Sequence, residues 1–204
     1  MINDRIKNLF RSFVSPVVNL FILLKIHPNI LTLTGSLISF LAGFLYAKGF
    51  FVYGGLVLAF GSIYDTFDGM VARKRKMVSS FGAFLDSTLD RFNEFFVLTG
   101  IAFFFYKNRM DIYALVTIFG MFSSLMVSYT RARSEGLGVE CKGGLMGRVE
   151  RMVFLILISF LPLNIYKFMI SLFTFLTFIT VIQRIFIVKN GIKKKEVIKN
   201  GEEK

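Results

Sequence analysis

The chain has 204 residues, of which 54% are hydrophobic and 26 are phenylalanine, and its mean hydropathy of +0.63 is well above that of a soluble protein. Its length predicts one domain over residues 1–204. One cysteine excludes an intramolecular disulfide framework and a cysteine-built metal site, and one histidine argues against histidine-based zinc chemistry and a Ser-His-Asp triad. The net charge is +12, but the basic residues fall mostly between apolar segments, which favours lipid head groups or phosphorylated substrates over nucleic acid as partners.

Residues 1–26 are expected to form a juxtamembrane helix. Basic and apolar side chains alternate over residues 1–11, a pattern typical of an interfacial helix that lies on a membrane. Residues 12–26 continue as an apolar segment that is short for a membrane span. The first residues lack the apolar run and the small-residue cleavage site of a signal peptide.

Residues 29–188 are expected to form an all-α, polytopic membrane bundle of six transmembrane helices. Each apolar segment is roughly 20 residues long, which is the length that a bilayer requires. The expected spans are residues 30–48, 51–73, 81–105, 112–132, 149–164 and 166–188, of which the fifth is short. Residues 189–204 form a basic tail that we expect to fray into solvent.

The basic residues predict how this bundle is oriented in the cell membrane. With six spans, both termini, the basic run of residues 73–76, the loop of residues 131–151 and the tail lie on one side. The opposite side carries only Lys48, Lys107, Arg109 and Lys167. Because positively charged loops face the cytoplasm, we expect the first side to be cytoplasmic.

Acidic residues cluster between two strongly apolar segments. Between residues 6 and 109, the acidic residues are Asp65, Asp68, Asp86, Asp90 and Glu94. Asp65 and Asp68 are three residues apart, and Asp86 and Asp90 are four apart, so each pair lies on one face of a helix. Two helices packed through these faces would bring four carboxylates together. Carboxylates beside hydrocarbon need cations, partners or water, so the cluster indicates a functional site.

Such a cluster of hard oxygen ligands favours Mg²⁺ or Mn²⁺. A divalent cation, or two, would remove the repulsion between these carboxylates. The alternative is ordinary ion pairing with Arg73, Arg91 and the basic run of residues 73–76. Four carboxylates exceed what that pairing needs.

The same stretch carries a longer pattern of fixed spacing. It reads Asp65-x2-Asp68-Gly69-x2-Ala72-Arg73-x8-Gly82-x3-Asp86-x3-Asp90. At all eight fixed positions it resembles the signature of the CDP-alcohol phosphatidyltransferases, a family of membrane enzymes. The resemblance implies that the four aspartates hold two divalent cations on the diphosphate of a CDP-linked lipid. It also implies that Asp90 is the general base that deprotonates the attacking hydroxyl.

The resemblance extends to the contacts with the CDP-linked lipid. The stretch Pro28-Asn29-Ile30-Leu31-Thr32 resembles the P-N-x-L-T sequence that opens the first span of this family and lines its nucleotide site. The implied donor contacts are Asn29, Ile30, Leu31, Thr32, Gly69, Ala72, Arg73, Ser79 and Gly82. Asn29 is also interpretable as a plain helix cap, and the two glycines as small residues of helix packing.

A second informative region, residues 128–151, carries several arginines. Arg131 and Arg133 end one expected span, Arg148 and Arg151 begin the next, and Arg184 lies inside the sixth, where an arginine needs a partner such as a bound phosphate. The run SYTRARSEG followed by GRVER resembles the subfamily that transfers to inositol phosphate, which implies that these arginines bind the acceptor phosphate. The alternative is a cytoplasmic loop whose charge follows the positive-inside bias.

The resemblance therefore implies an Mg²⁺-dependent enzyme that transfers a phosphatidyl-type group from CDP-diacylglycerol or CDP-archaeol to inositol phosphate and releases CMP. Alternatives within the family are a glycerol phosphate acceptor, or CDP-inositol as the donor. An alternative from another class is a membrane cation transporter, against which the position of all the acids near one membrane face argues. A homodimer is expected from the resemblance alone.

Overall fold

The computed structural model describes residues 4–141 and 143–202, and these residues form seven helices without a strand. The helices are α1 (Asp4–Leu23), α2 (Pro28–Ala47), α3 (Phe51–Lys74), α4 (Ser80–Lys107), α5 (Asp111–Gly136), α6 (Arg148–Ile158) and α7 (Leu163–Glu202). The expected all-α class is confirmed for this part of the chain. Each expected span corresponds to one of the helices α2–α7.

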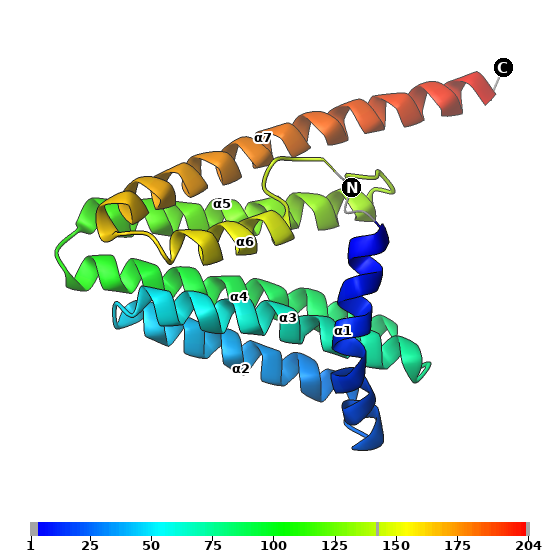
Figure 1. The fold of residues 1–204 in the computed structure, drawn as a ribbon. Coiled ribbons are helices and arrows are strands. Elements are labelled where there is room, and N and C mark those ends of the chain that lie inside the picture. Colours follow the sequence, from blue (N-terminus) through cyan, green and yellow to red (C-terminus); the bar gives the residue numbers. More distant parts are fainter. Residues whose placement is uncertain (1–3, 142, 203–204) are drawn as a thin grey trace.

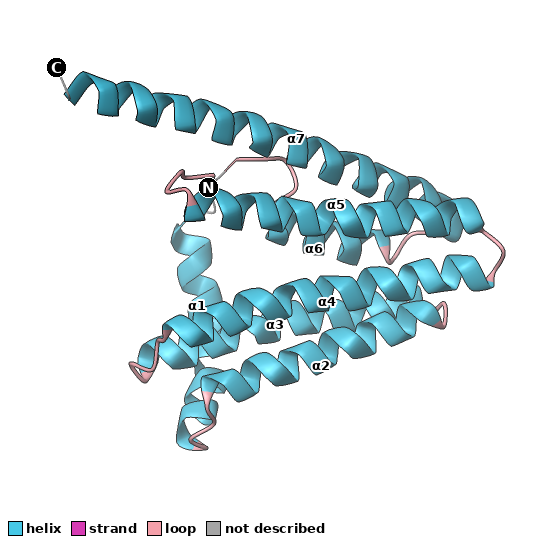
Figure 2. Cartoon of the chain, turned by 180° about the vertical axis from the view of Figure 1, so that it is seen from behind, coloured by secondary structure: helices cyan, strands magenta, loops and turns pink. Residues whose placement is uncertain are grey.

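Helices α2–α7 lie side by side along one direction, and α1 crosses the end of this bundle (Figure 1 and Figure 2). The connections after α3 and α5 lie at the end near α1, and those after α2, α4 and α6 lie at the opposite end (Figure 1). Lys74 Nζ fixes α3 to α1 by donating to Ser15 Oγ at 3.2 Å and to Asn19 Oδ1 at 2.9 Å. The basic loops therefore gather with α1 at one end of the molecule.

Within the described part of the chain, three helices are long and apolar enough to cross a membrane: α2, α5 and residues Leu163–Glu196 of α7. Helices α3 and α4 have 24 and 28 residues, but charged side chains interrupt their apolar sequences. Helix α6 has 11 residues, which at 1.5 Å per residue is about 17 Å. A bilayer core is about 30 Å thick, which exceeds the length of α6. A crossing by α3, α4 and α6 therefore stays a prediction, because α6 is short and charged side chains interrupt α3 and α4.

The outer surface of the bundle is apolar. Leu37 on α2, Phe119 on α5 and Phe168 on α7 are among many large hydrophobic side chains that are exposed. A soluble monomer rarely exposes apolar surface to this extent. Such a surface suits contact with lipid, in agreement with the high hydropathy of the sequence.

Helices α2 and α4 approach each other closely at two glycines. A Cβ at Gly100 would collide with the backbone oxygen of Gly43, and one at Gly43 would collide with the backbone oxygen of Phe96. Small residues allow helix backbones to approach in this way in membrane bundles. Because α3 and α4 both pack against α2, this approach helps to hold the acidic segments of α3 and α4 near one another.

The basic tail differs from the expectation. Helix α7 continues through Glu202 rather than fraying after residue 188. The connection between α5 and α6 supports this extension: a Cβ at Gly191 would lie 2.5 Å from Val139, and Lys195 Nζ donates to the Leu137 carbonyl at 3.3 Å. Tertiary contacts thus stabilise a helical segment whose composition alone favours solvent.

Candidate active site

Helices α3 and α4 place three aspartates around one point. One carboxylate oxygen from each of Asp65, Asp68 and Asp86 lies within 4.8 Å of the other two. The three-residue spacing puts both α3 carboxylates on one helical face, and α4 adds the third. The structure therefore brings together three of the four aspartates that the sequence predicts to bind metal.

Two hydrogen bonds orient Asp68. Thr32 Oγ1, on α2, donates to Asp68 Oδ2 at 2.7 Å, and the Gly69 N–H donates to Oδ1. The Thr32 and Asp68 side chains are both buried. Because these bonds fix the carboxylate plane, its remaining lone pairs point in a defined direction. Thr32, predicted as a donor contact, thus also supports the acidic cluster.

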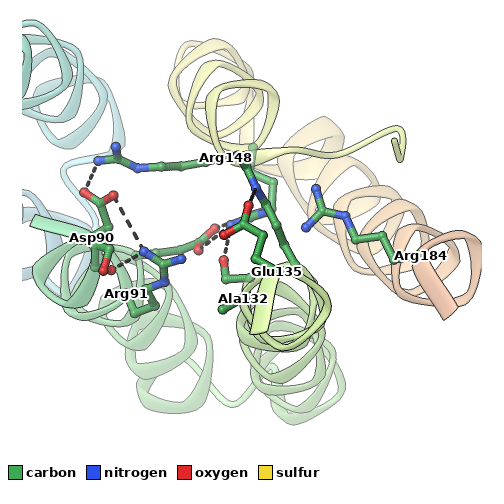
Figure 3. Close-up of a pocket in the computed structure, with 11 residues that line it drawn as sticks. Asp90, Arg91, Ala132, Glu135, Arg148 and Arg184 are labelled. Carbon is green, nitrogen blue, oxygen red and sulfur yellow. Dashed lines mark hydrogen bonds and ion pairs between the residues drawn. The ribbon is translucent and has the colours of Figure 1, made fainter. Parts of the chain in front are cut away.

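Asp90 lies one turn beyond Asp86 on α4, outside this cluster of three. Its carboxylate contacts the guanidinium of Arg148, from α6, and lies 3.8 Å from Arg91 Nη1. Arg148 Nη2 also donates to Asp65 Oδ2 at 2.8 Å, so this arginine bridges α3 and α4. Figure 3 shows Arg91 and Arg148 both directed at Asp90.

The donor set of the cluster fits a divalent cation. Carboxylate oxygens are the hard ligands that Mg²⁺ and Mn²⁺ prefer. Among the described residues, no arginine or lysine forms an ion pair with Asp68 or Asp86, and only Arg148 pairs with Asp65. Ordinary ion pairing therefore leaves most of the charge of this cluster uncompensated, and bound cations would compensate it.

A cavity of about 270 Å³ opens beside the cluster, and we call it the α2–α4 cavity. Seven of the nine residues predicted to contact the donor line it, together with two aspartates: Asn29, Thr32, Gly69, Ala72, Arg73, Ser79 and Gly82, with Asp68 and Asp86. Ile30 does not line this cavity and is 52% exposed. Leu31 is buried in the apolar cluster that joins α1, α2 and α3.

Two helix caps border the α2–α4 cavity. The N-cap of α2 is His27, whose side chain accepts a hydrogen bond from the Asn29 N–H at 3.2 Å. The interpretation of Asn29 as a cap is therefore wrong, because Asn29 lies within the helix. Ser79 is the N-cap of α4, and its Oγ accepts from the Gly82 N–H at 3.0 Å. A Cβ at Gly82 would lie 3.1 Å from Ser79 Oγ and 3.6 Å from Asn29 Oδ1, so glycine keeps this wall open.

A second cavity, of about 320 Å³, lies between α4, α5, α6 and α7, and we call it the arginine cavity. Four of the five arginines predicted to bind the acceptor phosphate line it: Arg131, Arg148, Arg151 and Arg184. Arg133 is exposed and does not line it. Asp90 also lines this cavity, and Figure 3 shows Arg184 approaching from the wall opposite it. The predicted base and most of the predicted acceptor arginines therefore share one cavity.

Besides Arg91 and Arg148, two more arginines of this cavity have carboxylate partners. Arg151 is 1% exposed, and its Nε and Nη2 donate to the two oxygens of Glu94 at 2.6 Å and 3.0 Å. Arg131 pairs with Glu135 at 2.9 Å, and both side chains are exposed. Arg151 is thus held by the protein, whereas an exposed pair such as Arg131 and Glu135 is weak and readily exchanged.

Arg184 has no carboxylate partner among the described residues. It is 5% exposed, and it donates to the backbone carbonyls of Gly143, at 3.1 Å, and Val127. A buried guanidinium bound only to neutral acceptors retains its charge, which a bound anion would compensate. The arginine cavity therefore suits a phosphorylated ligand.

The sequence prediction missed several residues of the arginine cavity. Arg91, Glu94, Ser128 and Glu135 line it, but none of them was predicted to belong to the acceptor site. Glu94 follows Asp90 by four residues, so helical spacing places both on one face and could have identified it. Ser128 and Glu135 lie three residues before and four residues after Arg131 on α5, so the same spacing rule places them on the face of a residue that was predicted.

Comparison with known proteins agrees with this geometry. Residues 25–186 match the sequence model of the CDP-alcohol phosphatidyltransferases. The chain belongs to this family. It is therefore a membrane-associated transferase of phospholipid biosynthesis, and the alternative of a cation transporter is not supported.

Relatives of this CDP-alcohol phosphatidyltransferase include synthases of archaetidylinositol phosphate and of phosphatidylinositol phosphate. The chain is 36% identical over 159 residues to the archaetidylinositol phosphate synthase of Methanothermobacter thermautotrophicus. The match covers 76% of this chain and 77% of that protein. The crystal structure of Mycobacterium tuberculosis phosphatidylinositol phosphate synthase with CDP-DAG bound matches with a TM-score of 0.82 and 26% identity, covering 87% of this chain and 94% of that one. The same mycobacterial enzyme in complex with manganese and citrate matches with a TM-score of 0.81 and 26% identity, covering 86% and 88% of the two chains.

Proposed function

We propose that this enzyme transfers a phosphatidyl-type group from CDP-diacylglycerol or CDP-archaeol to inositol phosphate and releases CMP. The observation that carries the proposal is the position of Asp90. It lines the arginine cavity, whereas Asp86, one turn away on α4, belongs to the carboxylate cluster at the α2–α4 cavity. One helical face thus joins a site suited to a diphosphate and a site suited to a phosphorylated acceptor.

The α2–α4 cavity is the proposed donor site. Asn29, Thr32 and Arg73 give it polar groups for a nucleotide and a phosphate, and its glycines leave the backbone accessible. Apolar walls complete the cavity, and the outer surface beside it suits lipid chains. The mycobacterial structure with bound CDP-DAG supports a CDP-linked lipid as the donor.

Asp65, Asp68, Asp86 and Asp90 are the residues that we propose to hold two divalent cations, Mg²⁺ or Mn²⁺. When bound, such cations neutralise negative charge on the attacking and leaving oxygens of the phosphodiester. Thr32 keeps one of these carboxylates in a fixed orientation. The manganese complex of the mycobacterial enzyme supports a divalent metal, and the converging oxygens support its position here.

The arginine cavity is the proposed acceptor site. Arg184 would bind the acceptor phosphate, because it is the buried guanidinium without a carboxylate partner among the described residues. Arg131, at an exposed position, would exchange Glu135 for the incoming phosphate. Asp90 would take the proton from the acceptor hydroxyl. The oxygen of that hydroxyl would bond to phosphorus as the bond from phosphorus to CMP breaks.

We further propose that the bundle crosses the cell membrane six times, with α1 on its cytoplasmic surface and the active site open to the cytoplasm. The distribution of basic residues supports this orientation, because the loops near α1 carry most of them. A homodimer is proposed from the family resemblance.

Product formation by the purified protein tests the proposal. The protein in detergent is incubated with CDP-diacylglycerol or CDP-archaeol and Mg²⁺, and released CMP is measured with L-myo-inositol 1-phosphate, glycerol 3-phosphate or free inositol as the acceptor. We expect CMP only with the inositol phosphate, and none after EDTA treatment until Mg²⁺ or Mn²⁺ is restored.

The same assay separates the alternatives. CMP released with glycerol 3-phosphate alone would replace the proposed acceptor with glycerol phosphate. Turnover of inositol phosphate with CDP-inositol but not with a CDP-lipid would reassign the donor.

A further inference from the structure

Glu94 is a buried carboxylate that the proposed reaction does not use. It lies on α4, one turn beyond Asp90, and is 3% exposed. Its Oε1 accepts from Arg151 Nε at 2.6 Å and from Ser124 Oγ at 2.5 Å, and its Oε2 accepts from Arg151 Nη2 at 3.0 Å. A two-pronged pair of this kind is strong and fixes the relative orientation of both groups.

Arg151 extends this network to the other walls of the arginine cavity. Its Nη1 donates to the Met146 carbonyl, just before α6, at 3.0 Å, and its Nη2 donates to Ser128 Oγ, on α5, at 3.2 Å. An arginine side chain has five N–H groups, and these contacts with Glu94, Met146 and Ser128 amount to four bonds. Arg151 is therefore a fixed part of the wall rather than a cation free to follow the acceptor.

The network also connects α6 to α4 and α5. This helix has only 11 residues, and its first residue is Arg148. Arg148 and Arg151 are three residues apart, so they lie on one face of α6. The guanidinium of Arg151 is tied to α4 and α5, while that of Arg148 reaches Asp65 and Asp90. A shift of Arg151 would displace Arg148 as well.

We propose that Glu94 is a positioning residue for the acceptor, acting through Arg151. It fixes Arg151 in the wall of the arginine cavity and holds α6 so that Arg148 stays beside Asp90. This inference rests on the proposed function, because it assumes that the arginine cavity binds the phosphorylated acceptor. The donor side does not contain the network, since neither Glu94 nor Arg151 lines the α2–α4 cavity.

Steady-state kinetics with both substrates test this role. Glu94→Gln keeps the shape of the side chain but removes its charge and leaves Arg151 uncompensated. We expect the KM for L-myo-inositol 1-phosphate to rise about tenfold, with the KM for CDP-diacylglycerol unchanged. Glu94→Asp keeps the charge and should recover part of the acceptor affinity.

If Glu94→Gln does not fold, a milder pair of variants tests whether Glu94 positions the acceptor. Ser124→Ala removes one hydrogen bond to Glu94, and we expect it to raise the acceptor KM about threefold. Ser123→Ala is the matched control: Ser123 is also buried, but its hydroxyl bonds Thr177 on α7 at 2.6 Å. It should lower the melting temperature to a similar degree without changing either KM.

The outcomes separate this inference from the proposed function. If the wild-type protein releases no CMP with any phosphorylated acceptor, both are overturned. If the wild type is active, but Ser124→Ala and Ser123→Ala change the acceptor KM equally or not at all, only the role of Glu94 is overturned.

Discussion

The two cavities differ in how the chain builds them. The walls of the α2–α4 cavity come from two short stretches, residues 28–32 and 68–86. Those of the arginine cavity come from four helices, with wall residues between positions 87 and 184. The walls of the first cavity therefore come from residues that are near one another in the sequence. The second cavity exists only when α4, α5, α6 and α7 pack together.

The cavities also differ in which charges remain uncompensated. Beside the α2–α4 cavity, Asp68 and Asp86 have no basic partner among the described residues. In the arginine cavity, Arg151 has its own carboxylate and Arg184 has none in the described part of the chain. Asp68, Asp86 and Arg184 are thus charges that ion pairing leaves available to a ligand in the described part of the chain.

Substitution of Asp90, which lines the arginine cavity one turn from the carboxylate cluster, should have the largest effect. Asp90→Asn removes the proposed proton acceptor with little change in size, and we expect turnover to fall by about 10²–10⁴-fold. Both KM values should change much less. The measurement is CMP release at saturating concentrations of both substrates. Asp111→Asn, at the start of α5 and outside both cavities, is the control, and normal turnover by Asp90→Asn would contradict the assignment.

Arg184→Gln should affect the arginine cavity alone. Loss of a charged hydrogen bond to the acceptor phosphate costs about 1.5–3 kcal/mol, so we expect the acceptor KM to rise about 10- to 100-fold. The KM for the CDP-lipid should not change. Arg133→Gln is the matched control, because Arg133 does not line the cavity. A weaker effect of Arg184→Gln than of this control would show that the phosphate binds elsewhere.

Thr32→Val should have a smaller effect, confined to the donor side. It removes the 2.7 Å hydrogen bond to Asp68 but keeps the shape of the side chain. We expect the affinity for Mn²⁺, measured by electron paramagnetic resonance, to fall about fivefold because Asp68 loses its orientation. The acceptor KM should stay constant.

Thr34→Val is the control for this prediction. Thr34 lies on the same helix, and its hydroxyl bonds Tyr64 at 2.8 Å instead of an aspartate. An equal loss of Mn²⁺ affinity in both variants would indicate a general effect on α2 rather than on the carboxylate cluster.

Part of this site was predictable from local spacing. Asp65, Asp68 and Asp86 meet because helical periodicity places acids on the facing sides of α3 and α4. Thr32 lines the α2–α4 cavity, whereas Ile30 does not, because α2 turns that side chain outward. The spacing of residues along a helix determines the direction of each side chain about that helix axis only. It does not determine which neighbouring element the side chain faces.

Other features could not be read from the sequence. Arg151 looks like any other arginine of its loop, and only the position of Glu94 on a different helix shows that its charge is already compensated. The close approach of Gly43 and Gly100 likewise depends on the crossing of α2 and α4. Composition predicted a frayed tail, but contacts with Val139 support α7 beyond residue 188.

The sequence by itself determined the helical class, the apolar character of the bundle and the acidic motif, because these follow from hydropathy and from the short-range periodicity of a helix. Only the tertiary structure decided which arginines are already paired, and that Arg184 has no carboxylate partner among the described residues. Ion pairs between helices depend on distances across the bundle, and no local pattern along the chain specifies those distances.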